Sequence, residues 1–313
     1  MVLNINGAMQ AFLADLNRTQ QQINQSSSEV SSGFRVQVPS DDPAAVPSIL
    51  ETQAAISANQ QIQSNLGSVA NELQTADSAL QSAVQAVENA VTLATQGASS
   101  TSSAADRANL AQQVAVLQQL LVGISQTTYN GRYIFSGDQD TGPAYQLDPT
   151  QPDGVKQLIS APSTRVIVDA TGTAISVAKT AQQIFGAQNS DGSDATGNVF
   201  AAINSLYLSL TDTSLSSSDQ QTAIVQAGSV LQSAGTYLNQ QLAFYGAAED
   251  RIATATDLAQ KFQTQQQAEL SGLRDADIPS DALQLSQAQT QQQAALSAES
   301  QIVQNKTLFS YLG

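Results

Sequence analysis

Residues 62–94, IQSNLGSVANELQTADSALQSAVQAVENAVTLA, decide the fold. Apolar residues recur there at alternating steps of four and three, at Ile62, Leu66, Val69, Leu73, Ala76, Leu80, Ala83, Val87, Ala90 and Ala94. This spacing is typical of the apolar seam of a long coiled-coil helix, which turns these side chains toward a partner helix. The stretch therefore predicts a long helix packed along at least one other helix.

Helix-start and helix-break signals flank this seam. Residues 40–42, SDD, are N-cap residue types and Pro43 suits a first helical turn, which predicts a helix from about residue 43 to 96. Residues 97–103, GASSTSS, interrupt the pattern, and a second helix is expected from about residue 105 to shortly before Asn130-Gly131. We expect these two helices to form a hairpin.

The back half of the chain repeats the pattern with one polar exception. Its seam consists of Ile224, Ala227, Leu231, Ala234, Leu238, Gln241, Tyr245, Ala248, Ile252, Ala255, Ala259 and Phe262. A helix of about 50 residues is ~75 Å long, whereas a compact globule of this chain length is only roughly 50 Å across. The sequence therefore predicts a mainly α protein, an elongated rod of long antiparallel coiled-coil helices.

Both ends of the chain carry a weaker seam with a seven-residue period. The predicted assembly seam consists of Met9, Leu16, Ile23 and Val30 near the N-terminus and Ala288, Ala295, Ile302 and Phe309 near the C-terminus. Polar residues occupy several partnering positions, at Thr19, Ser26, Gln292 and Glu299. Burial of one apolar stripe gains too little free energy to offset about 1–2 kcal/mol of backbone entropy lost per residue on folding. We expect these arms to order only against each other or against neighbouring molecules.

A β-rich insertion separates the helical halves. Short β-prone runs, separated by Pro, Gly and Asp, lie at 145–147, 155–160, 164–169 and 174–178, and a helical pattern returns over residues 198–210. The sequence thus predicts three parts, listed by residue range: terminal coiled-coil arms at 1–40 with 275–313, a helical rod domain at 41–136 with 196–274, and a variable β-rich insertion at 137–195.

Composition excludes several classes of function. The chain of 313 residues has 11 Lys and Arg against 26 Asp and Glu, so its net charge of −15 disfavours nucleic acid and anionic membranes as partners. It contains no Cys or His, which removes disulfides, thiolate nucleophiles, the usual zinc ligands and the commonest general base. No apolar run is long enough to span a membrane, and the first residues do not resemble a cleaved secretory signal.

Carboxylate clusters are the remaining candidates for chemistry. Asp41-Asp42, Asp138 with Asp140, and Asp191 with Asp194 are the clusters concerned. The last two partly resemble calcium loops but lack the following Gly and bidentate Glu of an EF-hand, and Asp in loops is usually turn chemistry. We therefore expect no enzyme activity, no metal and no cofactor. A secreted enzyme that uses an Asp pair in the insertion remains a remote alternative.

Three stretches resemble bacterial flagellins and flagellin-like junction proteins. They are Ser31-Ser-Gly-Phe-Arg-Val36 with Pro39-Ser-Asp-Asp-Pro-Ala44, then Thr128-Tyr-Asn-Gly-Arg-Tyr-Ile-Phe-Ser-Gly137, then Gly246-Ala-Ala-Glu-Asp-Arg-Ile252. The residues that carry the family motif are Ser32, Gly33, Arg35, Asp41, Asp42, Pro43, Asn130, Gly131, Arg132, Tyr133, Phe135 and Gly137. The opening Met1-Val-Leu-Asn-Ile-Asn6 reads more like the start of a flagellin than that of a junction protein.

The resemblance implies a structural subunit of the bacterial flagellum. It implies export without a cleaved signal peptide, through the flagellar secretion system, with a cytoplasmic chaperone. It further implies self-assembly outside the cell as a ring or helical layer between hook-associated protein 1 and flagellin, at the junction of hook and filament. Filament flagellin itself is the alternative.

Overall fold

The computed structural model describes residues 3–189 and 191–311, and the side chains of residues 9–189 and 191–300. Contacts within the chain divide it into two compact units. The terminal unit comprises residues 1–58 and 263–313, and the central unit comprises residues 59–262. These two units do not test the division into terminal arms, rod domain and insertion that the sequence predicts. That division stays a prediction.

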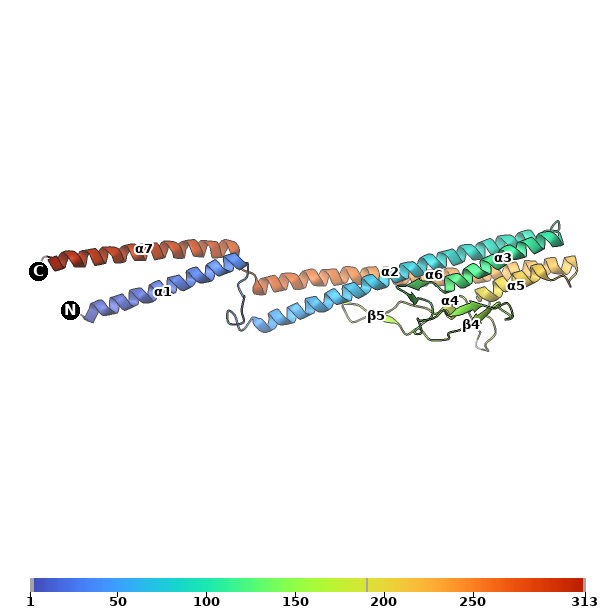
Figure 1. Ribbon diagram of the computed structural model, residues 1–313, viewed down its shortest axis with the longest axis horizontal. Coiled ribbons are helices and arrows are strands. Elements are labelled where there is room, and N and C mark those ends of the chain that lie inside the picture. The colour runs from blue at the N-terminus through green and yellow to red at the C-terminus, as the bar shows by residue number, and fades with distance from the viewer. Residues whose placement is uncertain (1–2, 190, 312–313) are drawn as a thin grey trace. The chain divides into compact units, whose positions relative to one another are not determined.

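Long helices dominate the structure, as the seams predict (Figure 1). The bounds of the helices, long and short, are α1 Leu3–Ser32, α2 Val46–Gly97, α3 Ala104–Ser125, α4 Ala181–Ile184, α5 Val199–Thr211, α6 Ser217–Arg274 and α7 Ile278–Tyr311. No helix within the described residues is apolar enough over a sufficient length to span a membrane. The prediction of a mainly α fold with a small β-rich insertion is confirmed.

Within the central unit, α2 and α6 run antiparallel. The amide of Asn59 donates to the carbonyl of Ala259 at 2.7 Å, near one end of the pair. Toward the other end, a Cβ at Gly228 would lie 3.3 Å from Ala94. Residue numbers fall along α6 as they rise along α2, and residues 59–97 alone extend ~58 Å at about 1.5 Å per residue. The predicted rod of antiparallel helices is therefore confirmed for this unit.

The core of the central unit follows the predicted seams. Every α2 seam residue from Leu66 to Ala94 is at most 8% exposed, and every α6 seam residue from Ile224 to Ala259 is at most 5% exposed. Helices α3 and α5 add Leu121, Phe200 and Leu206 to the same core, all fully buried. The long helices are thus held by burial of one continuous apolar stripe.

Within the described residues, three short antiparallel strand pairs form the β-rich region. The pairs are β1 Thr128–Tyr129 with β2 Arg132–Tyr133, β3 Tyr145–Leu147 with β4 Val155–Gln157, and β5 Val166–Val168 with β6 Ala174–Ser176. Strand β3 coincides with the predicted run 145–147, and β4, β5 and β6 lie inside the other predicted runs but are shorter. The first pair was not predicted as strands, although Asn130-Gly131 is a strong hairpin signal.

Aromatic and charged contacts fasten the insertion to the long helices. Phe135 meets Phe185 and Tyr245 edge-on, at ring-centroid distances of 5.9 and 6.3 Å. The Arg165 guanidinium pairs with both carboxylate oxygens of Glu72 on α2. The insertion therefore contacts α2 through Arg165 and reaches α6 through Phe185 and Phe135.

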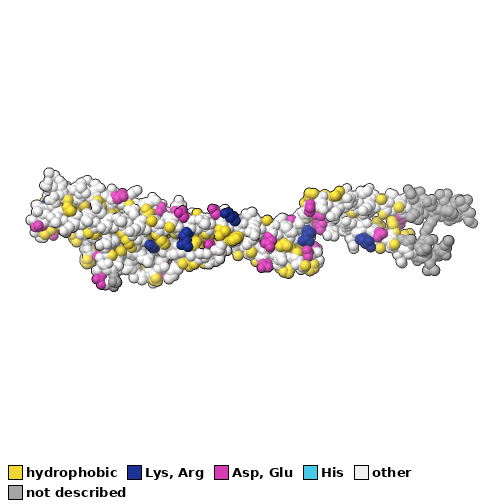
Figure 2. Space-filling view, turned by 180° about the vertical axis from the view of Figure 1, so that it is seen from behind, with side chains coloured by type: hydrophobic (Ala, Val, Ile, Leu, Met, Phe, Trp, Pro, Cys, Tyr) yellow, Lys and Arg dark blue, Asp and Glu magenta, His cyan; other side chains and the backbone are white. Residues whose placement is uncertain are grey.

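The terminal unit pairs α1 with α7. The two helices run antiparallel, with Gln292 donating to Gln20 at 2.6 Å, and Ser26 and Ala288 are at most 2% exposed between them. On the face that Figure 2 shows, charged side chains are few, and most of the described surface is uncharged polar side chain or backbone.

Candidate functional site

The first family motif forms the crossover segment, residues 33–45, which leads from α1 toward α2. Gly33 ends α1 with a φ of +75°, the left-handed conformation that glycine adopts without strain. Phe34 then forms a β-bridge with Asp275, and the Phe34 ring lies 3.8 Å from the guanidinium of Arg274. The motif therefore ties the end of α1 to the chain that follows α6.

The Arg35 side chain makes two contacts that join separate parts of the terminal unit. Its guanidinium donates to the carbonyl of Leu273 at 2.7 Å and to the carboxylate of Asp42 at 2.9 Å. The bond from Arg35 lowers the pKa of Asp42, and a further bond from the Ala45 amide acts in the same direction. One side chain thus joins the C-terminal end of α6 to the turn before α2.

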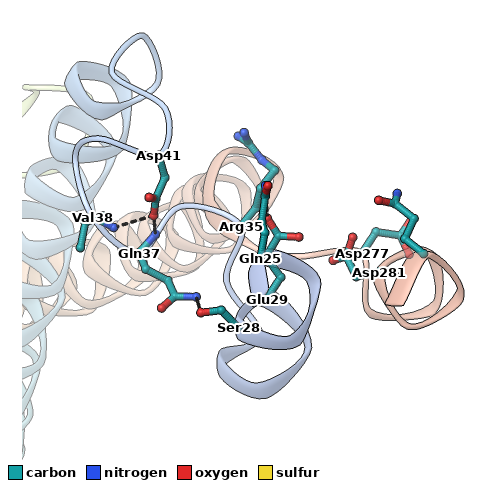
Figure 3. Close-up of a pocket in the computed structure, with 10 residues that line it drawn as sticks. Gln25, Ser28, Glu29, Arg35, Gln37, Val38, Asp41, Asp277 and Asp281 are labelled. Atoms are coloured by element: carbon teal, nitrogen blue, oxygen red, sulfur yellow. Dashed lines mark hydrogen bonds between the residues drawn. The ribbon is translucent and has the colours of Figure 1, made fainter. Parts of the chain in front are cut away.

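Asp41 has a role that the sequence did not predict (Figure 3). Its carboxylate accepts from the backbone amides of Gln37 and Val38, both at 2.9 Å, and these bonds lower its pKa. The expectation that Asp41 caps the following helix is wrong, because its partners precede it in the chain. Asp42 instead accepts from the Ala45 amide at 3.2 Å.

The start of α2 also needs a correction. The helix begins at Val46 rather than at about residue 43, and its first intrahelical bond runs from the Ile49 amide to the Ala45 carbonyl. Pro47, which lacks an amide hydrogen, occupies the first turn, where no intrahelical donor is needed. Pro43 lies in the preceding turn.

A polar cavity of about 750 Å³ lies beside the crossover segment in the terminal unit (Figure 3). Glu29 lines it while only 8% exposed, and accepts from Gln25 at 3.0 Å. Asp277, just before α7, and Asp281 in its first turn line the same cavity. Gln37 donates to Ser28 and Ser32 at 2.9 and 2.8 Å. Sequence reasoning missed Glu29, Arg274 and Asp277, since spacing along the chain gives no sign that these helix ends meet.

The second family motif forms a hairpin that enters the insertion. Asn130 and Gly131 have φ values of +50° and +77°, as a two-residue hairpin turn requires. Arg132 pairs with Asp140 at 3.0 Å, and Phe135 is fully buried. Gly137 has a φ of +65° and faces the Pro162 carbonyl, which a Cβ would approach to 2.6 Å. Tyr133 is only half-buried, so Phe135 is the residue that anchors the turn.

The predicted assembly seam lies along α1 and α7, and within the terminal unit it is incompletely covered. Met9 is 39% exposed, while Leu16, Ile23, Val30 and Ala295 are half-buried and Ala288 is buried. Ile302 and Phe309 lie outside the residues whose side chains the structure describes. Further apolar side chains are exposed on the same helices, with Leu13 at 47% and Leu296 at 48%.

The remaining carboxylate clusters bond to neighbouring loops and turns. Asp138 accepts from the amide and hydroxyl of Thr164, and Asp191 accepts from the amide and hydroxyl of Ser193. Among the described residues, no three acidic side chains gather as they would around a metal ion. Asp191 thus stabilises its own turn, and Asp138 joins two segments of the insertion.

Comparisons with known proteins match both ends of the chain. The bacterial flagellin N-terminal helical region matches residues 3–140, and the bacterial flagellin C-terminal helical region matches residues 229–312, together well over half of the chain. Flagellar hook-associated protein 3 of Escherichia coli (strain K12) is 28% identical over 203 residues, which cover 62% of each chain. B-type flagellin of Pseudomonas aeruginosa is 29% identical over 142 residues, which cover 45% of this chain and 29% of the flagellin.

A solved structure carries the same fold. The flagellar hook-associated protein 3 of Legionella pneumophila superimposes with a TM-score of 0.61 at 15% identity, over 72% of this chain and 98% of that one. The matched regions span less than two thirds of the length of both sequence relatives. Matches at both ends, joined by a shared fold, show that the chain belongs to the bacterial flagellin family and is similar to flagellar hook-associated protein 3.

Proposed function

We propose that this chain is a structural subunit of the bacterial flagellum that forms the junction between hook and filament. The observation that carries the assembly role is the half-exposed seam of α1 and α7. Apolar stripes that stay open in one molecule are buried when copies pack side by side, at about 25 cal/mol per Å² of apolar surface. In this proposal Leu16, Ile23 and Ala295 contact neighbouring subunits.

The junction role is supported by similarity to hook-associated protein 3 over 62% of both chains, against 29% of the flagellin. A junction layer needs two different faces, one for hook-associated protein 1 and one for flagellin, with further copies of the chain at its sides. Such a layer stops growing because its two end faces do not match each other, so no second layer of the same chain can be added. A chaperone in the cytoplasm and export through the flagellar channel to the outside of the cell belong to the same proposal.

Deletion of the gene tests the junction role. We expect intact hooks, no filaments and flagellin released into the medium, with filaments restored by the parent gene on a plasmid. Immunogold labelling should give one spot at the tip of each hook. Continuous label along filaments would contradict the junction role.

Filament flagellin is the second candidate, because the same helical regions match flagellins. The two roles differ in self-elongation. Purified protein added to filament seeds should not lengthen them if it forms a junction. Long filaments of this chain alone would establish the flagellin role instead.

A further inference from the structure

The β5–β6 hairpin has one buried face and one exposed face. Ile167 and Ile175, which lie opposite each other in the register, are 8% and 3% exposed and belong to the core of the central unit. On the other face of β5, Val166 and Val168 are 54% and 50% exposed. Strand β5 therefore carries two neighbouring apolar side chains that the described part of the chain leaves uncovered.

The hydrogen-bond pattern of the hairpin shows where the backbone of β5 points. The amide of Asp169 donates to the carbonyl of Thr173 at 3.0 Å, which makes these two residues a hydrogen-bonded pair. Bonded and non-bonded pairs alternate along antiparallel strands. In the observed register Ile167 is therefore bonded to β6, whereas the amide and carbonyl groups of Val166 and Val168 point away from β6.

The outer edge of β5 has no partner strand within the described residues. Strands β5 and β6 form a sheet of their own, and no described residue outside the hairpin bonds to the backbone of Val166 or Val168. Proteins often protect such an edge with Lys or Pro, but the Val-Ile-Val sequence of β5 contains neither. A free and apolar edge is the kind of surface to which a further strand adds.

The sequence around β5 is complementary to itself in the antiparallel direction. Residues 165–169 read RVIVD. If a second copy lies antiparallel with Ile167 opposite Ile167, each Val166 faces a Val168 and each Arg165 faces an Asp169. The outward amides and carbonyls of the two valines then bond to each other, and opposite charges meet at both ends. Parallel pairing in register would instead place Arg165 against Arg165.

We propose that two copies of this chain associate through their β5 edges as antiparallel strands, which makes one continuous sheet of β6, β5, β5 and β6. Arg165 already pairs with Glu72, and Asp169 already bonds to its own turn, so these charges set the direction of pairing more than its strength. Two short strands bury far less than the roughly 1,200 Å² of a stable interface, so the dimer is weak.

The proposed contact does not depend on the assembly role, because it uses no residue of α1 or α7. The same surface patch serves both copies, so the contact closes after two chains. It therefore forms between free chains rather than within a layer of subunits that all point the same way.

Disulfide trapping in the full chain tests the register. The parent chain contains no cysteine, so an introduced thiol is the only one present. Val166→Cys mixed with Val168→Cys under mild oxidation should form dimers about fivefold faster than either variant alone. Opposite Cβ atoms lie about 4.5–5.5 Å apart, whereas a residue and its own copy are diagonal neighbours at about 7–8 Å. Val225→Cys on α6, where the valine is 57% exposed, mixed with Val168→Cys is the control for random collision.

Proline substitution tests which edge pairs. Val166→Pro removes an outward amide from each copy and no bond to β6, so self-association measured by sedimentation equilibrium should weaken about tenfold. Ala174→Pro, which removes an outward amide from the other edge of the hairpin, is the matched control and should associate like the parent chain. A variant whose β5–β6 amide signals disappear by NMR has lost the hairpin, and the disulfide test then decides.

Three results would overturn the proposal. The first is a Val166→Cys and Val168→Cys mixture that cross-links no faster than the control mixture, or more slowly than each variant with itself, which indicates parallel pairing. The second is equal loss of association in Val166→Pro and Ala174→Pro. The third is protection of the β5 amides from hydrogen exchange only in isolated hook–filament complexes, with none in the concentrated free chain. That last result would assign the edge to another protein of the complex.

Discussion

Two seams with similar spacing behave differently in this molecule. From Leu66 to Ala94 the central seam is at most 8% exposed, whereas Met9 in the terminal seam is 39% exposed and Leu16 and Ile23 are half-buried. The central seam of α2 shares its core with α3, α5 and α6, while the described seam of α1 has α7 as its partner in the terminal unit. The period of a pattern predicts which stripe is apolar, and the number of partner helices decides whether that stripe is covered.

The largest expected effect comes from a charge in the covered seam. Leu80→Asp replaces a fully buried leucine with an unpaired carboxylate, so we expect more than about 4 kcal/mol of lost stability and no native fold at 37 °C. Urea unfolding followed by circular dichroism measures the free energy of unfolding. Leu80→Met, which keeps volume and polarity, should cost less than about 1.5 kcal/mol. A folded Leu80→Asp protein would mean that the central seam is not the core.

The same charge in the open seam should separate stability from assembly. Leu16→Asp puts a carboxylate at a half-buried position, so the monomer should lose no more than about 1 kcal/mol of unfolding free energy. Assembly should fail, because neighbours would bury that charge. Filament formation in a complemented deletion strain is the measurement. Asn17→Asp, with the same charge at the next, exposed position, should still support filaments. Normal filaments with Leu16→Asp would remove Leu16 from the subunit interface.

A smaller effect is expected at the crossover segment, where contacts are polar. Arg35→Lys keeps the charge but cannot reach both the Leu273 carbonyl and the Asp42 carboxylate. Amide hydrogen exchange over residues 33–45 should quicken about fivefold, as expected for one lost hydrogen bond. Arg18→Lys, at an exposed pair with Asp15, is the control and should change nothing. Unchanged exchange in Arg35→Lys would show that Arg35 does not hold the crossover segment.

The smallest effect is the acid response of the same segment. Hydrogen bonds from the backbone amides of Val38 and Gln37 hold the pKa of Asp41 below its usual 3.8. The stability that the ionised Asp41 carboxylate contributes is therefore present above pH 3.8 and is lost as the pH falls through the lowered pKa. The amide NMR signals of Gln37 and Val38 should therefore shift with a midpoint below 3.8. In Asp41→Asn that titration should vanish. A midpoint above 3.8 would contradict the two bonds.

Local patterns predicted more of the fold than of the site. Heptad spacing predicted the long helices, and the apolar pattern that starts at Asn198 predicted α5. Both signals depend only on residues that are close in the sequence. Arg35 and Asp41 could be singled out by resemblance, yet their partners could not. The Leu273 carbonyl is 238 residues from Arg35, and the Asp41 carboxylate bonds backward in the chain. Such contacts depend on how helix ends meet, which no spacing rule encodes.

Hydrogen exchange across the two seams distinguishes a covered seam from an open one. In the free monomer, amides of α1 and α7 should exchange far faster than those of residues 62–94, because the described terminal seam residues other than Ala288 are half-buried or exposed. After incorporation into isolated hook–filament complexes, the α1 and α7 amides should become as protected as residues 62–94. Terminal helices that are already as protected as residues 62–94 in the monomer, or that gain no protection in the complex, would contradict the account.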